Sequence, residues 1–297
     1  MATLEDWQRA GRIAAALIER GKKLIKPGVR LLDIATTVED ELAKAGAALA
    51  FPINLSLNST AAHDTPEPGD PRVLDESHLV KLDIGVCVNG AIADRAVTVD
   101  LTESWKELVK ASEEALEAAL KLATPGTALC SIGRAISEII ESYGYKTIRN
   151  LSGHGLSEWS LHTGLSIPNH DNKDMRELSA GSYIAIEPFA TDGGGMVGER
   201  GEPKSWSLVQ SKAVRDPVAR VLLRQLGRFK GLPFSLRQLT LPGQSLQRLR
   251  LALRALDDVG ALKSYPPLIE RANGMVSQAE HTVLVAEKPQ ILSAETF

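Results

Sequence analysis

Two aspartates in a short alternating segment are placed to bind one cation together. Residues 79–101, LVKLDIGVCVNGAIADRAVTVDL, alternate apolar with polar or small positions, which predicts a strand on each side of Asn89-Gly90. Asn-Gly is the preferred two-residue hairpin turn. With this turn, Asp83 and Asp94 share one face of the hairpin as diagonal neighbours. Like charges so placed repel each other unless a cation offsets them.

The cation could be a metal ion or a basic side chain of the same hairpin. Lys81 is two residues from Asp83, and Arg95 follows Asp94 directly. Arg95 points to the opposite face of its strand, which weakens the second interpretation. The aspartate pair alone leaves both a metal site and a structural ion pair open.

Three further residues have the chemistry of metal ligands. His154 lies between two glycines in LSGHGLSEW, where the backbone can be approached closely. Glu187 ends a predicted buried strand in IAIEPF, and Glu280 is predicted within a strand in QAEHTVLV, facing the same way as Thr282. Each alone is more often a salt-bridged structural residue. Together with the two aspartates they form an oxygen-rich set that suits divalent manganese, iron or cobalt better than structural zinc.

A degenerate internal repeat would bring these residues to one point. A long predicted helix, a Pro-Gly pair and a shorter predicted helix occur twice, and strand-like segments follow both copies. Laid side by side, Asp83 corresponds to Glu187, and Asp94 corresponds to Glu280. A pseudo-twofold axis between two such hairpins would gather all four carboxylates, whereas coincidence among short strand-like strings is the alternative. The predicted helices are 4–24, 31–45, 104–122 and 128–143.

The segment between Glu187 and Glu280 has a different character over residues 196–273. It is rich in arginine and leucine, as in VARVLLRQLGRF and SLQRLRLALRALDDVG, and Asp216-Pro217 is a typical helix start. We interpret it as a helical insertion that interrupts the second hairpin. Its arginines form either a solvated outer face or a basic surface that touches ribosomal RNA.

The composition is that of an ordinary globular chain. The 297 residues are 43% hydrophobic and 24% charged, and the net charge of −3 implies no general attraction to DNA or to membranes. The two cysteines have no paired spacing, which argues against a disulfide framework and fits a reducing compartment. The sequence contains no signal-peptide pattern and no apolar run near the ~20 residues of a membrane span, so we expect a cytoplasmic protein.

The order of these residues and their sequence contexts resemble type II methionine aminopeptidases of an archaeal-like kind. AAHDTP, LDIG, IAD, GHG, LHTGLSIPN, IEPFAT and AEHTVLV match motifs of that family over most of the chain. The long helical segment distinguishes type II from type I. The resemblance implies an α/β (α+β) pita-bread fold with a pseudo-twofold repeat, two metal-bearing β-hairpins flanked by helices, and a helical insertion. The catalytic domain would comprise residues 1–195 and 274–297, and the insert subdomain residues 196–273.

The resemblance also implies roles at a dinuclear site. Two divalent metal ions (Co, Mn, Fe or Zn) would be present, and two of the carboxylates would bridge them. Glu187 would shuttle a proton as general base and acid, and His63 would stabilise the developing oxyanion. His162 would contact the substrate carbonyl or the residue beyond it. The implied ligands are Asp83, Asp94, His154, Glu187 and Glu280, with Asp94 and Glu280 as the bridges.

The implied substrates are nascent polypeptide N-termini that carry the initiator methionine before a small second residue. The enzyme would act as a monomer, and whether the ribosome is also a partner stays open. A methionine side chain needs a small apolar pocket. By resemblance Phe51, Pro52, Leu161 and Tyr265 would line it, and ordinary core is the alternative for each.

Two rival interpretations share the fold. A prolidase-type enzyme is disfavoured by the insert and by LHTGLSIPN. A catalytically inactive relative that binds RNA or protein is disfavoured because all five ligands are present. Cys87 departs from the commonest motif and is predicted on the ligand-bearing face, either as a packed thiol or as an adventitious metal ligand.

Overall fold

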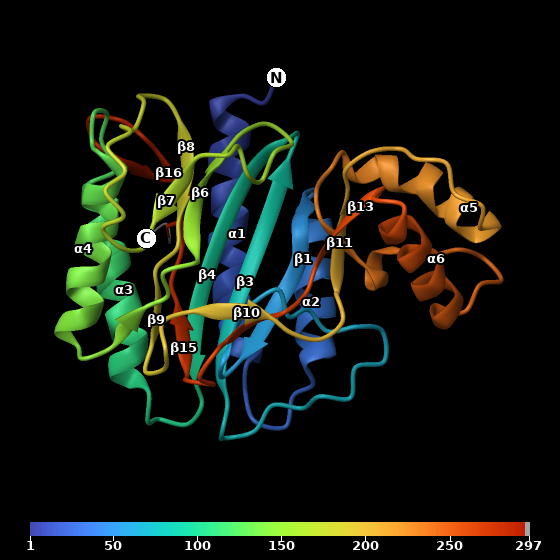
Figure 1. Cartoon of the computed structure of the whole chain (residues 1–297), viewed down its shortest axis with the longest axis horizontal. Helices are drawn as coiled ribbons and strands as arrows, with labels where there is room; N and C mark the ends of the chain where they lie inside the picture. Colours follow the sequence, from blue (N-terminus) through green and yellow to red (C-terminus); the bar gives the residue numbers. More distant parts are fainter. Residues whose placement is uncertain (295–297) are drawn as a thin grey trace.

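The computed structural model describes residues 1–294, in which helices flank a central group of β-sheets and a smaller lobe lies to one side (Figure 1). Residues 295–297 of the predicted catalytic domain lie outside the described residues. Within the described part, no helix is both long and apolar enough to cross a membrane.

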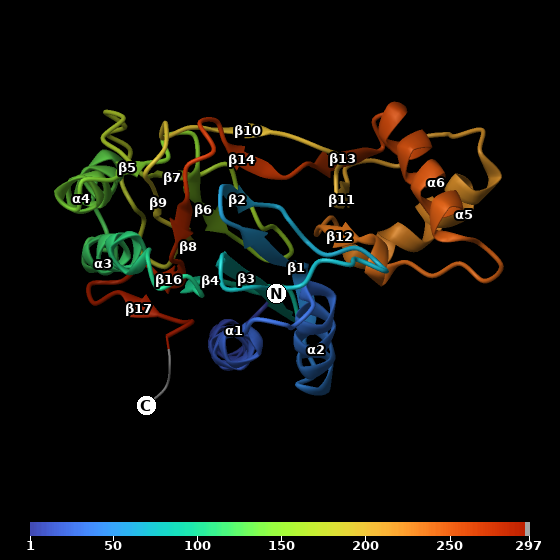
Figure 2. The same ribbon diagram turned by 90° about the horizontal axis from the view of Figure 1, so that it is seen from below.

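The N-terminal half is a three-stranded sheet covered by two helices. Its elements are α1 (Leu4–Leu24), α2 (Leu31–Lys44), β1 (Ala48–Leu57), β2 (Thr60–Ala62), β3 (Leu79–Val88) and β4 (Ala91–Asp100). The sheet order is β1-β3-β4; α1 packs against β3 and β4, and α2 packs against β1 (Figure 2). Thr3 and Asp6 form a capping box that fixes the start of α1. Leucine, isoleucine and valine side chains fill the space between the helices and the sheet.

The predicted first hairpin and its register are confirmed. Asp83 pairs with Ala96, and Gly85 pairs with Asp94. The turn residues have positive φ, 51° at Asn89 and 100° at Gly90, as a tight hairpin turn of this type requires. Asp83 and Asp94 are therefore diagonal neighbours on one face of the hairpin.

The second half repeats this arrangement with more, shorter strands. Its elements are α3 (Lys106–Lys121), α4 (Leu129–Ser142), β5 (Lys146–Thr147), β6 (Ser152–Leu156), β7 (Ser166–Pro168), β8 (Tyr183–Ile186), β9 (Phe189–Thr191), β15 (Val276–Gln278), β16 (His281–Leu284) and β17 (Gln290–Ile291). They form sheets of order β17-β16-β8-β6-β7 and β15-β9-β5, and α3 and α4 cover the outer side (Figure 1). The four predicted helices are confirmed, with small shifts at their ends.

The second hairpin is formed by segments far apart in the chain. His281 pairs with Ile186 across β16 and β8, and Phe189 pairs with Gln278 across β9 and β15. The two pairs follow the same register, so β8 and β9 together run antiparallel to β15 and β16 without a shift. Glu280 was expected within a strand, but it lies in the break between β15 and β16. The break interrupts the ladder where its side chain turns toward the site.

The two hairpins lie side by side through reciprocal hydrogen bonds. The Thr282 hydroxyl accepts from the Asp94 backbone N–H at 2.7 Å and donates to the Asp94 carbonyl at 2.9 Å. The Thr98 hydroxyl accepts from the Gln278 backbone N–H at 2.8 Å and donates to the Gln278 carbonyl at 2.7 Å. Each hairpin thus supplies a threonine that bonds the other, and this fixes the carboxylates of both hairpins relative to one another.

The insert contains a small sheet as well as helices, so the prediction of a purely helical insertion is incomplete. Its elements are β10 (Val197–Glu199), β11 (Ser205–Leu208), α5 (Pro217–Leu226), η1 (Gly227–Phe229), β12 (Phe234–Ser235), η2 (Leu236–Gln238), α6 (Leu246–Asp258), β13 (Leu262–Tyr265) and β14 (Leu268–Glu270). The predicted start of α5 is confirmed, because Asp216 accepts from the Ala219 backbone N–H at 2.8 Å. The strands are only two to four residues long, too short to show a periodicity in the sequence.

The insert has its own apolar core and is attached through a two-stranded neck. Trp206, Leu222, Phe234 and Leu253 belong to this core. In the neck, β10 pairs with β14, and β14 pairs with β2 of the first half. The sheet β12-β11-β13 lies between the helices α5 and α6 and the central sheets (Figure 2).

Candidate metal centre

Four carboxylates from the two hairpins converge on one cavity. Asp83 lies in β3, Asp94 in β4, Glu187 directly after β8 and Glu280 directly before β16, and all four line the cavity. Asp94 and Glu280 are buried, with 3% and 1% of their surface exposed. Asp83 and Glu187 are partly exposed. The structure therefore brings together the four acids that the repeat aligned.

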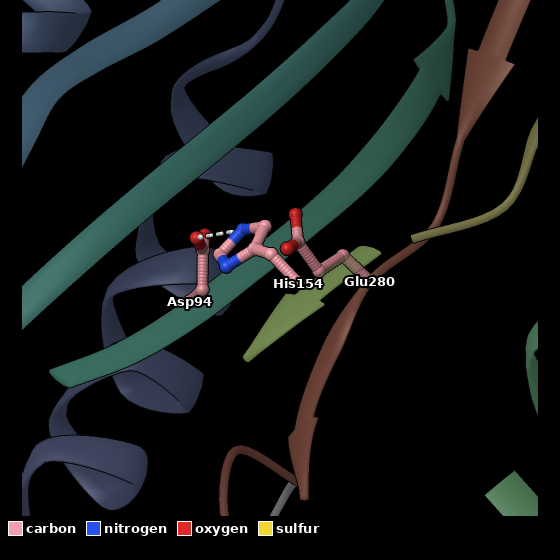
Figure 3. Close-up of side chains that lie close together, drawn as sticks. All are labelled: Asp94, His154 and Glu280. Carbon is pink, nitrogen blue, oxygen red and sulfur yellow. Dashed lines mark ion pairs between the residues drawn. The ribbon is translucent and has the colours of Figure 1, made fainter. Parts of the chain in front are cut away.

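His154 enters the same cluster from β6. Its Nε2 lies 3.5 Å from Asp94 Oδ2 and 3.8 Å from Glu187 Oε1. Figure 3 shows the side chains of Asp94, His154 and Glu280 close together. Ligand atoms of these three residues all lie within 4.8 Å of one another. The flanking glycines permit this placement: a Cβ on Gly153 would lie 2.3 Å from the Ala185 carbonyl oxygen.

The two basic residues of the first hairpin donate to backbone carbonyls. The Lys81 ammonium is buried and donates to the Asn58 backbone carbonyl at 2.6 Å. Arg95 lies on the opposite face, as predicted, and donates to the Glu280 backbone carbonyl at 2.8 Å. Hydrogen bonds from both side chains therefore go to backbone carbonyls, at Asn58 and at Glu280.

Several buried polar atoms of the cluster have no hydrogen-bond partner among the described residues. They are Asp83 Oδ1, Asp94 Oδ1, His154 Nδ1 and Glu280 Oε1. Buried acceptors without partners are costly, and a divalent cation satisfies several of them at once. The donor set of carboxylate oxygens and one imidazole fits a divalent metal ion of the first transition row.

The protonation of the cluster reflects burial and mutual repulsion. Burial, with a smaller contribution from repulsion by Asp94, raises the pKa values of Asp83, Glu187 and Glu280 well above their usual range. Burial raises the pKa of Asp94 to about 7. Without a cation the site thus favours bound protons, and a metal ion must displace them.

Two further histidines face the cavity, as expected from their motifs. The ring centroids of His162 and His154 lie 4.3 Å apart. The ring centroids of His63 and Tyr265 lie 5.6 Å apart, with the two rings in an edge-to-face arrangement. Burial lowers the pKa of His63 to about 4 and that of His162 to about 3. Both imidazoles are therefore neutral at pH 7 and can form hydrogen bonds without carrying a charge.

The cavity has a volume of about 80 Å³, and part of its wall beside the carboxylates is apolar; we call this part the apolar recess. All four residues expected for the substrate pocket line it: Phe51, Pro52, Leu161 and Tyr265. The Tyr265 hydroxyl lies 3.0 Å from the Ser207 hydroxyl, which fixes the ring. A Cβ on Gly85 would lie 2.3 Å from Phe51 Cε1, so the absence of a side chain at Gly85 makes room for the ring of Phe51.

The sequence interpretation missed several residues of the site. Asn54 donates to Asp83 Oδ2 at 3.5 Å, and Gln278 donates to Glu280 Oε2 at 3.2 Å. Asn54 pairs with Asp83 across β1 and β3, so a predicted pairing of these strands would have revealed it. Ser205 and Pro233 come from the insert, and no local pattern marks them.

The remaining histidines and Cys87 lie outside the cluster. His78 Nδ1 accepts a hydrogen bond from the Asp75 backbone N–H. His281 faces away from the site, and its Nδ1 is hydrogen-bonded to the Ser293 hydroxyl. The Cys87 side chain is buried in an apolar group with Phe51 and Leu156. This placement favours the packed thiol over a metal ligand.

Sequence comparisons identify relatives along nearly the whole chain. A profile of metallopeptidase family M24 matches residues 5–287. The methionine aminopeptidase of Methanocaldococcus jannaschii is 45% identical over 279 residues, which cover 94% of both chains. That of Pyrococcus abyssi is 44% identical over 292 residues, covering 96% of this chain and 97% of its own.

Solved structures share the fold at lower sequence identity. The methionine aminopeptidase of Thermotoga maritima superposes with a TM-score of 0.72 at 24% identity, covering 98% of this chain and 96% of its own. A thermophilic Arx1 gives a TM-score of 0.86 at 14% identity, covering 100% and 93%. The prolidase of Pyrococcus furiosus gives 0.64 at 19% identity, covering 99% and 64%. These likenesses confirm the expected mixed α/β pita-bread fold.

Proposed function

The chain belongs to metallopeptidase family M24, and from this membership we propose that it is a metal-dependent methionine aminopeptidase. It hydrolyses the first peptide bond of polypeptides that begin with methionine followed by a small residue. One observation carries the proposal: a small apolar recess opens directly onto a cluster of four carboxylates and one imidazole. The curated relatives at 44–45% identity, all named methionine aminopeptidases, support it.

We assign two divalent ions to the cluster, held by Asp83, Asp94, His154, Glu187 and Glu280. The unpartnered buried oxygens of three of the carboxylates and the close approach of Asp94, His154 and Glu280 support this assignment. Manganese, iron, cobalt and zinc all suit such donors. When bound, the ions lower the pKa of a coordinated water and polarise the substrate carbonyl.

The side chains of the chain supply proton transfer and hydrogen bonds. Glu187 takes the proton of the attacking water on a carboxylate oxygen and returns it to the leaving amine. His63, which stays neutral, donates a hydrogen bond to the developing oxyanion, and His162 contacts the substrate carbonyl from the other side.

The recess selects the methionine side chain by shape and polarity. Phe51, Pro52 and Leu161 offer apolar contact, and Tyr265 closes the recess from the insert. A thioether side chain is flexible and polarisable, so it packs well against aromatic rings. A branched side chain would leave some of these contacts unmade. A charged side chain would lose its solvent on entering the recess.

The finer classification follows from the insert. We assign the chain to type II, with an archaeal-like organisation, because residues 196–273 form a subdomain between the two strands of the second hairpin. Nascent polypeptides are the proposed substrates, the cytoplasm the proposed location and a monomer the proposed state. The arginines of α5 and α6 form either a solvated outer face or a surface that contacts the ribosome, and the proposed activity requires neither.

The test is release of methionine from Met-Ala-Ser by metal-free protein titrated with Mn²⁺, Co²⁺, Fe²⁺ or Zn²⁺. We expect release with at least one metal, much slower release from Met-Lys-Ser, and none from N-acetyl-Met-Ala-Ser. The acetylated control tests recognition of the free amine. Absence of release with every metal at saturating concentration would refute the proposed function.

A further inference from the structure

The loop that carries His63 is held in an uncommon backbone conformation. His63 has φ of 64°, in the left-handed region that non-glycine residues occupy when surrounding contacts impose it. The next residue, Asp64, is buried, with 5% of its surface exposed. Contacts made by Asp64 and the residues after it therefore restrain the backbone from which the imidazole of His63 projects. The ring itself contacts Tyr265 and the Pro266 backbone.

Asp64 is fixed from two directions. Lys204 of the insert places Nζ 2.6 Å from Asp64 Oδ1. The Arg72 guanidinium donates one hydrogen bond to each Asp64 carboxylate oxygen, at 2.6 Å and 3.1 Å. The Asp64 backbone carbonyl accepts from the Leu55 N–H of β1 at 2.8 Å. Charge-assisted hydrogen bonds in a buried position are strong and restrict geometry, so this carboxylate is an anchor for the loop.

A second cation of the insert holds the following residues. Arg237, in η2, donates to Thr65 Oγ1 at 2.9 Å and to the Pro66 carbonyl, and pairs with Glu39 of α2. Thr65 donates in turn to the Ile53 carbonyl of β1 at 2.6 Å. The Arg237 side chain is only 7% exposed. The loop is thus tied at once to the insert and to the strand that carries the apolar recess.

We infer that Lys204 and Arg237 are positioning residues for His63. Through them the insert sets the geometry of the reaction in addition to closing the recess. Neither side chain lines the cavity, so their effect on turnover must pass through Asp64, Thr65 and the backbone of His63. The inference rests on the role proposed for His63 above.

Lys204→Met removes the cation while keeping most of the side-chain volume. Misplacing a catalytic group by about 1 Å costs on the order of 100-fold in rate, so we expect kcat to fall about 10- to 100-fold. KM and metal content should change little, because the recess and the ligands are untouched. Lys204→Arg, which keeps the charge, should restore part of the lost kcat.

The decisive measurement repeats Lys204→Met in the His63→Ala background. If Lys204 acts through His63, the second substitution should change kcat by less than about twofold, since the group that it positions is gone. An equal loss in both backgrounds would overturn the inference. The imidazole resonance of His63, identified by its absence in His63→Ala, gives a readout apart from activity. It should shift in Lys204→Met, and an unshifted resonance with unchanged kcat would also overturn the inference.

A second variant covers the case in which Lys204→Met does not fold. Arg237→Met combined with Glu39→Gln removes the other contact without leaving a buried carboxylate unpaired, and it should shift the same resonance and lower kcat. The matched control is Arg250→Met, which breaks a half-exposed ion pair between the insert and Glu67 of the same loop. It should leave both readouts unchanged. If the parent protein releases no methionine, the proposed function fails, whereas an active parent with a normal Lys204→Met variant refutes only the positioning role.

Discussion

Replacing Asp94 by asparagine should stabilise the metal-free protein and destabilise the metal-loaded protein. The substitution keeps the shape of the side chain and removes one of four converging charges. The backbone bonds of Asp94 to Thr282 do not involve the side chain and survive. One carboxylate oxygen of Asp94 has no partner among the described residues, and the amide oxygen of the variant can still accept the bond from the Arg95 backbone N–H.

The size of the effect follows from the pKa of Asp94. Burial raises this pKa from 3.8 to about 7 in the folded protein. The shift means that ionising Asp94 costs about 4 kcal/mol more in the folded protein than in the unfolded chain. Below pH 3.8 both folded and unfolded states are protonated, and the group has no effect on stability. From pH 3.8 to 7 the unfolded state gives up its proton first, so metal-free stability falls as the pH rises. Above pH 7 the loss is complete.

Urea denaturation with chelator, at pH 5, 6, 7 and 8, measures this effect. Asp94→Asn should be more stable than the parent at pH 8 by up to about 4 kcal/mol, with the difference shrinking toward pH 4. With saturating Mn²⁺ the order should reverse, because the variant lacks a ligand and gains less from binding. A metal-free variant that is less stable than the parent at pH 8 would show that burial of ionised Asp94 does not destabilise the metal-free protein.

Other substitutions and conditions test the remaining parts of the site. His63→Ala should bind metal normally and lose about 10²–10³ in kcat, as elemental analysis and peptide kinetics would show; full activity, or a lost metal, would contradict its role. Tyr265→Ala should weaken turnover of methionyl peptides at unchanged metal content, and activity equal to the parent would return Tyr265 to a structural role. Gly85→Ala should raise KM, since the added Cβ displaces the ring of Phe51; an unchanged KM would count against that ring as part of the recess. Metal affinity, measured by calorimetry, should fall as the pH drops below 7, by about tenfold per pH unit for each proton displaced, and a flat profile would contradict the raised pKa values of the cluster.

The sequence predicted what local patterns can encode. The Asn89-Gly90 turn fixed the register of the first hairpin, and that register places Asp83 and Asp94 as expected. The internal repeat aligned Glu187 with Asp83 and Glu280 with Asp94, and the structure brings all four side chains to one cavity. These predictions succeeded because alternation and turn chemistry act over few residues.

Contacts between distant segments could not be predicted in the same way. Asn54 reaches Asp83 only because β1 pairs with β3, and Lys204 reaches Asp64 only because the insert folds back on the loop. The break that takes Glu280 out of its strand depends on the neighbouring hairpin, to which its backbone N–H bonds at Ala96. Such features depend on tertiary packing, which a single sequence does not display.

The pairing of β8 with β16 across the whole insert has a consequence for folding kinetics. The second hairpin closes a long loop, which is slow, although the separate core of the insert shortens the loop that remains to be closed. Until it closes, Glu187 and Glu280 are far from Asp83 and Asp94, and metal ions have no assembled site to bind. We therefore expect bound metal to slow unfolding, which prolongs the lifetime of the folded protein, and to leave the folding rate nearly unchanged.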